Sequence, residues 1–147
     1  MNKIALASDH AGFHGKEAIK KTLAELGVEY ADLGTHSEDS VDYPDYAERV
    51  ARAVAAGEYE RGILVCGSGI GMEIAANKVP GIRAALAWNE ETARLARTHN
   101  DANIVAVGER TTPPETIDRI IRIFLTTEFA GGRHARRIEK IAKLEQR

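Results

Sequence analysis

Strand-like and helix-like segments alternate along the whole sequence, and this alternation constrains the fold more than any other feature. Short apolar runs predict strands at 3–8, 28–33, 62–66, 82–87 and 103–107. Apolar residues at helical spacing predict helices at 16–26, 44–56, 72–77, 90–98, from about 114 onward, and at 133–144. Strands separated by helices pair in parallel through right-handed crossovers. The sequence therefore predicts an α/β fold, a three-layer α/β/α sandwich with a five-stranded parallel sheet.

Two of the predicted helices carry further signals. Residues 112–115 (Thr-Pro-Pro-Glu) have the form of a capping box with proline in the first turn, which predicts a helix start there. The last helix follows the pair Gly131 and Gly132 and lies beyond the complete sandwich. The pattern alone leaves open whether this extra C-terminal helix packs on its own sheet or on another subunit.

The bulk properties of the chain exclude several classes of protein. Its 147 residues suit one domain, predicted over 1–147, and are few for two. A formal charge of −2 gives no general attraction to nucleic acid or anionic lipid. One cysteine cannot form an intramolecular disulfide, and we find neither a signal peptide nor a run of about 20 apolar residues. We therefore expect a cytoplasmic protein that acts on neither membranes nor nucleic acid.

Polar and glycine residues follow three of the predicted strands. Ligands of open parallel sheets bind at the carboxyl ends of the strands, so these residues mark the expected pocket. The residues concerned are Ser8-Asp9-His10, Cys66-Gly67-Ser68-Gly69-Ile70-Gly71 and Gly108-Glu109-Arg110. We expect the helix that ends near residue 98 to add His99 and Asn100 to the same pocket.

The glycine turn is the strongest single feature of this pocket. Gly67, Gly69 and Gly71 allow tight turns whose amides bind a phosphate or an oxyanion, although such glycines also serve close strand–helix packing. Met72 stands where a dinucleotide-binding fingerprint requires glycine, and the turn follows the third strand, so NAD is discounted. Cys66 directly precedes the turn. A cysteine that ends a buried strand is often only a small apolar residue, but this location favours the reactive thiolate.

Histidines and arginines supply the remaining chemistry. His10 and His99, beside Asp9 and Asn100, suggest acid–base work. No metal-ligand spacing joins them to the other histidines, which are His14, His36 and His134, so no metal is expected. Exposed arginines usually serve only solvation, but Arg133 and Arg137 share a helix face and, with Arg110, could clamp a phosphate.

The combined motifs resemble the type B ribose-5-phosphate isomerases, a family that also includes allose- and galactose-6-phosphate isomerases. The matching segments are Ser8-Asp9-His10-Ala11-Gly12, Asp32-Leu33-Gly34-Thr35, Asp42-Tyr43-Pro44, Cys66-Gly67-Ser68-Gly69-Ile70-Gly71, Ala75-Ala76-Asn77-Lys78, Gly81-Ile82-Arg83-Ala84, His99-Asn100-Asp101-Ala102-Asn103 and Gly131-Gly132-Arg133-His134. The resemblance implies a Rossmann-like homodimer, sometimes paired into a tetramer, with active sites between subunits and no cofactor or metal. It also implies that the last helix, about 133–145, packs on the partner subunit.

The resemblance assigns a role to each site residue. By similarity, Cys66 moves the proton between C2 and C1 of an aldose phosphate, and the amides of Gly67, Gly69 and Gly71 hold the cis-enediolate with Ser68. His99 opens the sugar ring with help from Asp9. The remaining expected contacts are Asn100 and Tyr43 on the sugar, and His10, Arg110, Arg133 and Arg137 on the phosphate.

Several alternatives stay open at this stage. Some family members use a carboxylate further along the loop as base, and Glu73 lies there, but the turn matches the cysteine-bearing branch. Ser68 replaces a threonine of many members and keeps the hydroxyl. The expected substrate is ribose 5-phosphate, in the pentose phosphate pathway. A hexose 6-phosphate (allose or galactose), a tetrose phosphate, or a non-catalytic sugar-phosphate sensor are the alternatives.

Overall fold

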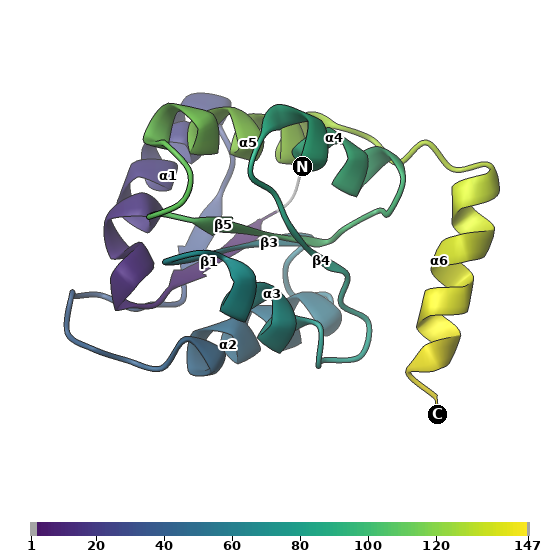
Figure 1. The fold of residues 1–147 in the computed structure, drawn as a ribbon, viewed down its shortest axis with the longest axis horizontal. Coiled ribbons are helices and arrows are strands. Elements are labelled where there is room, and N and C mark those ends of the chain that lie inside the picture. Colours follow the sequence, from purple (N-terminus) through teal and green to yellow (C-terminus); the bar gives the residue numbers. More distant parts are fainter. Residues whose placement is uncertain (1–2, 147) are drawn as a thin grey trace.

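The computed structural model describes residues 3–146, which form a five-stranded parallel sheet with helices on both faces (Figure 1). The strands are β1 (Ile4–Ser8), β2 (Tyr30–Asp32), β3 (Arg61–Cys66), β4 (Ala84–Leu86) and β5 (Ile104–Gly108). Their order across the sheet is β2-β1-β3-β5-β4. This arrangement confirms the predicted α/β/α fold. The predicted domain, 1–147, also includes Met1, Asn2 and Arg147, which lie outside the described residues.

The first five α-helices form two layers because each carries one apolar stripe that is buried against the sheet. Helices α1 (Phe13–Leu26), α4 (Glu90–Thr98) and α5 (Pro114–Thr126) cover one face, where Phe124 and Ile120 are completely buried. Helices α2 (Tyr43–Ala55) and α3 (Ile70–Ala76) cover the other face, around Val50 and Met72. A short 3₁₀ turn, η1 (His10–Gly12), joins β1 to α1. The sheet therefore has two separate apolar cores, one on each side.

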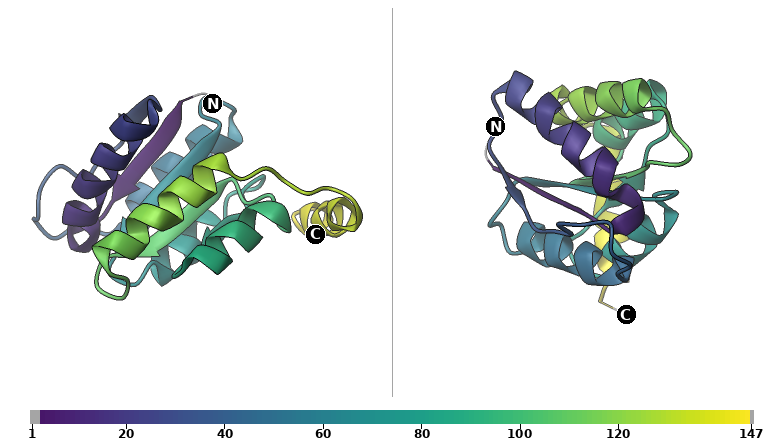
Figure 2. Two further views of the ribbon diagram at one scale, coloured as in Figure 1. Left: turned by 90° about the horizontal axis from the view of Figure 1, so that it is seen from above. Right: turned by 90° about the vertical axis from the view of Figure 1, so that its left-hand side faces the viewer.

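The last helix, α6 (Arg133–Leu144), lies apart from the sandwich, at the end of the molecule beyond α4 (Figures 1 and 2). None of its residues is buried, and Ile141 and Leu144 are 43% and 56% exposed. At its carboxyl end, the Glu145 carboxylate accepts hydrogen bonds of 3.0 and 3.1 Å from the Gly81 amide. An amphipathic helix gains stability by burying its apolar face, and this chain leaves that face of α6 open.

The ends of several elements differ from the prediction. The capping box predicted at Thr112 is wrong, because Pro113 precedes the helix and no side chain caps α5. Pro113 is followed by Pro114, and a residue before proline avoids the helical region, so Pro113 takes ψ 148°. A capping box does occur at α4, between Asn89 and Thr92. Helix α1 begins at Phe13, three residues before the predicted start.

A buried ion pair joins α1 to the end of β2. The Lys16 side chain is completely buried, and its Nζ lies 2.7 and 2.6 Å from the Asp32 carboxylate oxygens. Burial by itself would raise the pKa of Asp32, but hydrogen bonds from Lys16, Lys20 and the Gly34 amide lower it below its usual value. The carboxylate is thus held charged at the edge of the sheet.

Within residues 3–146, no helix is both long and apolar enough to cross a membrane.

Candidate active site

A cleft with a volume of about 590 Å³ opens at the carboxyl ends of β1, β3 and β5. The strand-end rule placed the site at this edge of the sheet. The cleft is lined by these residues named in the sequence analysis: Asp9, His10, Tyr43, Cys66, Gly67, Ser68, Gly71 and Arg110. Four further residues line it: Ala11 and Ile70, which lie within the motifs described above, and Ile74 and Thr111, which the sequence analysis did not name.

Cys66 is the last residue of the fully buried strand β3, and its side chain borders the cleft. The residue is only 5% exposed. The Gly69 amide donates a hydrogen bond of 3.1 Å to the Cys66 sulfur. A main-chain donor at this distance stabilises negative charge on the sulfur. The thiol is therefore placed to exchange a proton with a molecule in the cleft.

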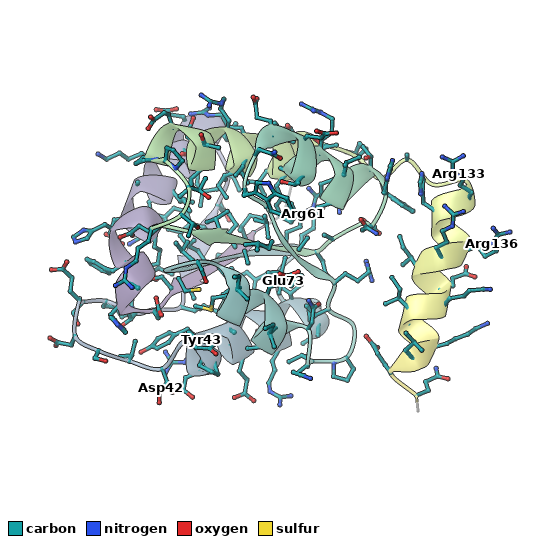
Figure 3. The ribbon with its side chains drawn as sticks, viewed as in Figure 1. Asp42, Tyr43, Arg61, Glu73, Arg133 and Arg136 are labelled. Atoms are coloured by element: carbon teal, nitrogen blue, oxygen red, sulfur yellow. The ribbon has the colours of Figure 1, made fainter. Side chains whose placement is uncertain are left out.

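The glycine turn after Cys66 has no room for side chains at two of its positions. Gly69 has φ +81°, and a Cβ there would lie 2.5 Å from a methyl carbon of Leu86. A Cβ on Gly71 would lie 2.5 Å from the Tyr43 ring. Tyr43, labelled in Figure 3, begins α2 and is 41% exposed, so it packs on the turn and forms part of the cleft wall. The close packing at Gly69 and Gly71 thus agrees with one interpretation of the turn, while the Gly69 amide is turned to the Cys66 sulfur and Gly69 does not line the cleft.

Asp9 and His10 follow β1 and have separate local partners. The buried Asp9 carboxylate caps η1 by accepting a 3.0 Å hydrogen bond from the Gly12 amide. The Val41 amide donates a 3.1 Å hydrogen bond to His10 Nδ1. Because Nδ1 acts as the acceptor, the hydrogen of the neutral ring is on Nε2. His10 therefore offers an N–H donor to an anion.

Arg110 lies directly over the start of the glycine turn. Its amide donates a 2.9 Å hydrogen bond to the carbonyl oxygen of Gly67. A Cβ on Gly67 would lie 3.5 Å from the Arg110 Nη1 atom, so the guanidinium group packs against this glycine. Arg110 and His10 both line the cleft and together present donors that suit a phosphate.

His99 lies near the amino ends of the strands, whereas Cys66 lies at their carboxyl ends. Helix α4 starts after β4 and runs back, so His99 at its end lies near the start of β5. The prediction that His99 and Asn100 share a pocket with His10 is therefore wrong within one chain. The physical reason is that a crossover helix between parallel strands always ends at their amino edge.

The His99 ring instead packs against α6. It stacks on His134, with ring centroids 4.2 Å apart and an interplanar angle of 15°. Arg133 and Arg137 lie on the same helix, and Figure 3 shows Arg133 far from Tyr43. Loss of solvent, and then the charges of His99, Arg133 and Arg137, lower the pKa of His134. These residues form a second basic group, separate from the cleft.

A second pocket, of about 470 Å³, lies between the sandwich and α6. Asn100 and Glu73 line it together with Ile141 and Leu144 of α6. Glu73, labelled in Figure 3, is on α3 but does not line the Cys66 cleft. The alternative base of the family is therefore not in the same pocket as the thiol in this chain.

Among residues 3–146, no group of three or more His, Cys, Asp or Glu side chains is arranged to hold a metal ion.

Two contacts of the site were not found by sequence reasoning. One is the Val41 amide on His10, and the other is the hydrogen bond from the Gly15 amide to the Glu109 carboxylate. Each joins segments that are distant in sequence, and the donor in each case is the main chain. The only signal for Glu109 was its position directly after a strand.

Comparison with known proteins places this geometry in a family. A sequence model of the family described as ribose/galactose isomerase matches residues 4–141. Ribose-5-phosphate isomerase B of Escherichia coli is 48% identical over 147 residues, which cover 100% of this chain and 99% of the relative.

Solved structures agree with this result. A type B ribose 5-phosphate isomerase of Trypanosoma brucei has a TM-score of 0.96 and 55% identity, covering 99% of both chains. Ribose-5-phosphate isomerase B of Mycoplasma genitalium, with bound ribulose-5-phosphate, has a TM-score of 0.94 and 41% identity, covering 98% of this chain and 96% of that chain. These matches confirm the resemblance predicted from the motifs. The chain therefore belongs to the ribose/galactose isomerase family, and within it to the type B ribose-5-phosphate isomerases.

Proposed function

We propose that this enzyme interconverts D-ribose 5-phosphate and D-ribulose 5-phosphate, with Cys66 as the base that moves the proton. The observation that carries the proposal is the Cys66 sulfur, which borders the cleft and accepts a hydrogen bond from the Gly69 amide. Relatives of this chain are named for the same reaction, and one was solved with ribulose-5-phosphate bound. The enzyme is thus an aldose–ketose isomerase.

The proposed reaction passes through a cis-enediolate. Cys66 takes the proton from C2 of the open-chain aldose, and the electrons move onto the C1 carbonyl oxygen. In this scheme, main-chain N–H groups of the glycine turn, with Ser68, stabilise the resulting oxyanion. The thiol then returns its proton to C1 while the hydroxyl proton moves from O2 to O1, which leaves a ketone at C2. No metal or cofactor takes part in this scheme.

The phosphate group binds in the same cleft in this proposal. His10 Nε2 and the Arg110 guanidinium group supply donors for its oxygens. Binding energy from the phosphate, which does not react, orients the carbons that do. Tyr43, which also lines the cleft, contacts the sugar.

A second subunit supplies the groups that one chain cannot bring to the cleft. His99, Asn100, Arg133 and Arg137 lie on the far side of the molecule, and α6 exposes Ile141 and Leu144 there. We propose a homodimer, which can pair into a tetramer, in which α6 packs on the partner. His99 of one subunit then opens the sugar ring beside Asp9 of the other. The arginines of α6 complete the phosphate site.

Two observations separate the proposal from its rivals. Glu73 lines a different pocket from Cys66, which favours the cysteine as the base. The cleft also holds the thiol together with the phosphate donors, whereas a sugar-phosphate sensor needs only the donors. A hexose 6-phosphate or a tetrose phosphate would undergo the same chemistry. The proposed setting is the cytoplasm and the pentose phosphate pathway.

Isotope exchange across a panel of sugar phosphates tests the proposal. In deuterated water, we expect ribose 5-phosphate to be converted with incorporation of solvent deuterium, at a higher kcat/KM than allose 6-phosphate, galactose 6-phosphate or erythrose 4-phosphate. Nuclear magnetic resonance measures both the label and the product. Binding without conversion or label would identify a sensor, and a higher kcat/KM for a hexose phosphate would reassign the substrate.

A further inference from the structure

Helix α1 has no side-chain cap of its own. Its N-cap residue is Gly12, and a Cβ there would lie 2.4 Å from the carbonyl oxygen of Val65. No capping side chain fits at this position, so the first amides of α1 need other acceptors. The Gly15 amide donates its hydrogen bond to the Glu109 carboxylate, which comes from the loop after β5. Glu109 thus caps α1 from 94 residues away.

The contact between Glu109 and Gly15 depends on close packing. A Cβ on Gly15 would lie 3.1 Å from Glu109 Oε1 and 3.2 Å from a methyl carbon of Val65. The main chain of Glu109 is fixed as well, because its amide donates a 2.9 Å hydrogen bond to the carbonyl oxygen of Cys66. A negatively charged carboxylate is also favourable at the positive end of a helix. The side chain is therefore fixed at both ends.

Glu109 connects the two segments that carry the proposed phosphate donors. His10 lies in η1, which leads directly into α1, and Arg110 is the next residue after Glu109. We propose that Glu109 is a positioning residue, which sets the spacing of His10 and Arg110 by holding α1 against the loop after β5. This inference rests on the proposed function, in which both side chains bind the substrate phosphate.

The Glu109 side chain acts through these neighbours and does not touch the substrate. Glu109 is not among the residues that line the cleft. Its carboxylate accepts the Gly15 hydrogen bond at the amino end of α1, whose positive dipole offsets part of the negative charge. Its removal is therefore expected to weaken phosphate binding and to leave proton transfer at Cys66 largely intact.

Substitutions at Glu109 test this role with inorganic phosphate as the probe. For the full-length Glu109→Ala enzyme, we expect about tenfold weaker binding of inorganic phosphate by calorimetry and about a tenfold higher KM for ribose 5-phosphate. The kcat should stay within about threefold of the unmodified enzyme. Glu109→Gln keeps an oxygen that can accept the Gly15 hydrogen bond, so it should restore most of the phosphate affinity.

A matched control separates positioning from general stabilisation of α1. The Thr22 hydroxyl donates a 2.6 Å hydrogen bond to Asp118 and so ties the same helix to α5, away from the cleft. Thr22→Val should lower the melting temperature without changing phosphate affinity or KM. If Glu109→Ala does not fold, Glu109→Asp, which keeps the charge but shortens the side chain, should show the same loss of phosphate affinity.

The proposal is overturned if the folded Glu109 variants bind inorganic phosphate as tightly as the unmodified enzyme. It is also overturned if Glu109→Gln is as impaired as Glu109→Ala, or if Thr22→Val weakens phosphate binding equally. Failure of the proposed function is a different result: the unmodified enzyme would convert no sugar phosphate, while the calorimetric comparison would still report on Glu109.

Discussion

The sulfur of Cys66 is enclosed by protein and still borders the cleft. The Gly69 amide, which donates to it, belongs to the same turn that provides the proposed oxyanion donors. Main-chain donors keep their positions without the rotational freedom of side chains, so the charge-stabilising part of this site is fixed in advance. A small change at residue 66 should therefore affect the base and leave its surroundings in place.

Replacing the sulfur tests this at the level of one atom. We expect Cys66→Ala and Cys66→Ser to lower kcat for ribose 5-phosphate by about 10²–10⁴-fold, because a general base of the right strength is lost. The KM should change little, since His10 and Arg110 are untouched. Steady-state kinetics measures both values.

Glu73→Gln is the matched control for Cys66, because it removes the other candidate base. Its kcat should stay within about threefold of the unmodified enzyme. A serine variant with more than about a tenth of the original kcat, or a Glu73 variant that is as slow as Cys66→Ala, would contradict the assignment of the base.

At the scale of residues, the sequence predicts the site residues that directly follow strands. It does not predict their hydrogen-bond partners, which come from distant segments. Cys66, His10 and Arg110 lie together because the carboxyl ends of parallel strands meet at one edge. Val41 donates to His10 from 31 residues away, and Glu109 accepts from Gly15 across 94 residues. No local spacing encodes such contacts, because tertiary packing alone creates them.

At the level of elements, periodicity identifies strands and helices better than it identifies their ends. The predicted strand 62–66 corresponds to β3, because a continuous apolar run is buried on both faces. The capping signal at Thr112 failed because two successive prolines force an extended residue before the helix. The burial of Lys16 could not be predicted, because its partner Asp32 lies on another element.

The ion pair between Lys16 and Asp32 should contribute strongly to stability. Asp32→Asn removes the nearer carboxylate from a buried ammonium group and leaves only Glu17, at 3.5 Å, so we expect a loss of about 3 kcal/mol at pH 7. The hydrogen bonds lower the pKa of Asp32 in the folded state, so its contribution is present above the unfolded pKa of about 3.9 and is lost as the pH falls through the folded value. Urea unfolding at pH 7 and at pH 3 measures the difference, which should shrink on acidification.

Asp118→Asn provides the comparison for this pair. Asp118 is also paired, with Arg122, but it is 39% exposed, so its loss should cost less than about 1 kcal/mol. The prediction would be wrong if the two substitutions lowered the free energy of unfolding equally. It would also be wrong if the loss caused by Asp32→Asn were the same at pH 7 and pH 3.

At the level of the whole molecule, the proposed catalytic groups lie in two places, some at the carboxyl ends of the strands and the others at the amino ends. Cys66 and His10 lie at the carboxyl edge, and His99 lies at the amino edge beside α6. In the proposed dimer, the carboxyl ends of the strands of one copy would face the amino ends of the other, and two-fold symmetry would then give two equivalent sites. This arrangement could not be predicted from local patterns, because the direction of α4 follows from the order of the whole sheet.

Mixing two inactive variants tests this division. If Cys66 and His99 of one site come from different subunits, a hybrid of Cys66→Ala and His99→Asn chains has one intact site and one doubly altered site. After random reassociation, half of the dimers are hybrids, so we expect about a quarter of the unmodified activity. Activity is measured before and after mild unfolding and refolding of the mixture.

Each variant refolded alone serves as the control and should stay inactive. A mixture that remains inactive, although mass spectrometry detects the hybrid dimer, would place both residues of each site in a single chain.

Helix α4 runs from the carboxyl ends of the strands back to their amino ends, and this direction affects how the enzyme should respond to dilution. If each site uses residues of both subunits, a single protomer holds part of one site and part of another. Such a protomer would not convert substrate. The rate per milligram would then fall when the concentration drops below the dissociation constant of the pair, and it would recover on concentration. The affinity between the two chains would thereby set a minimum concentration of this protein, below which the cell would obtain no isomerase activity from it.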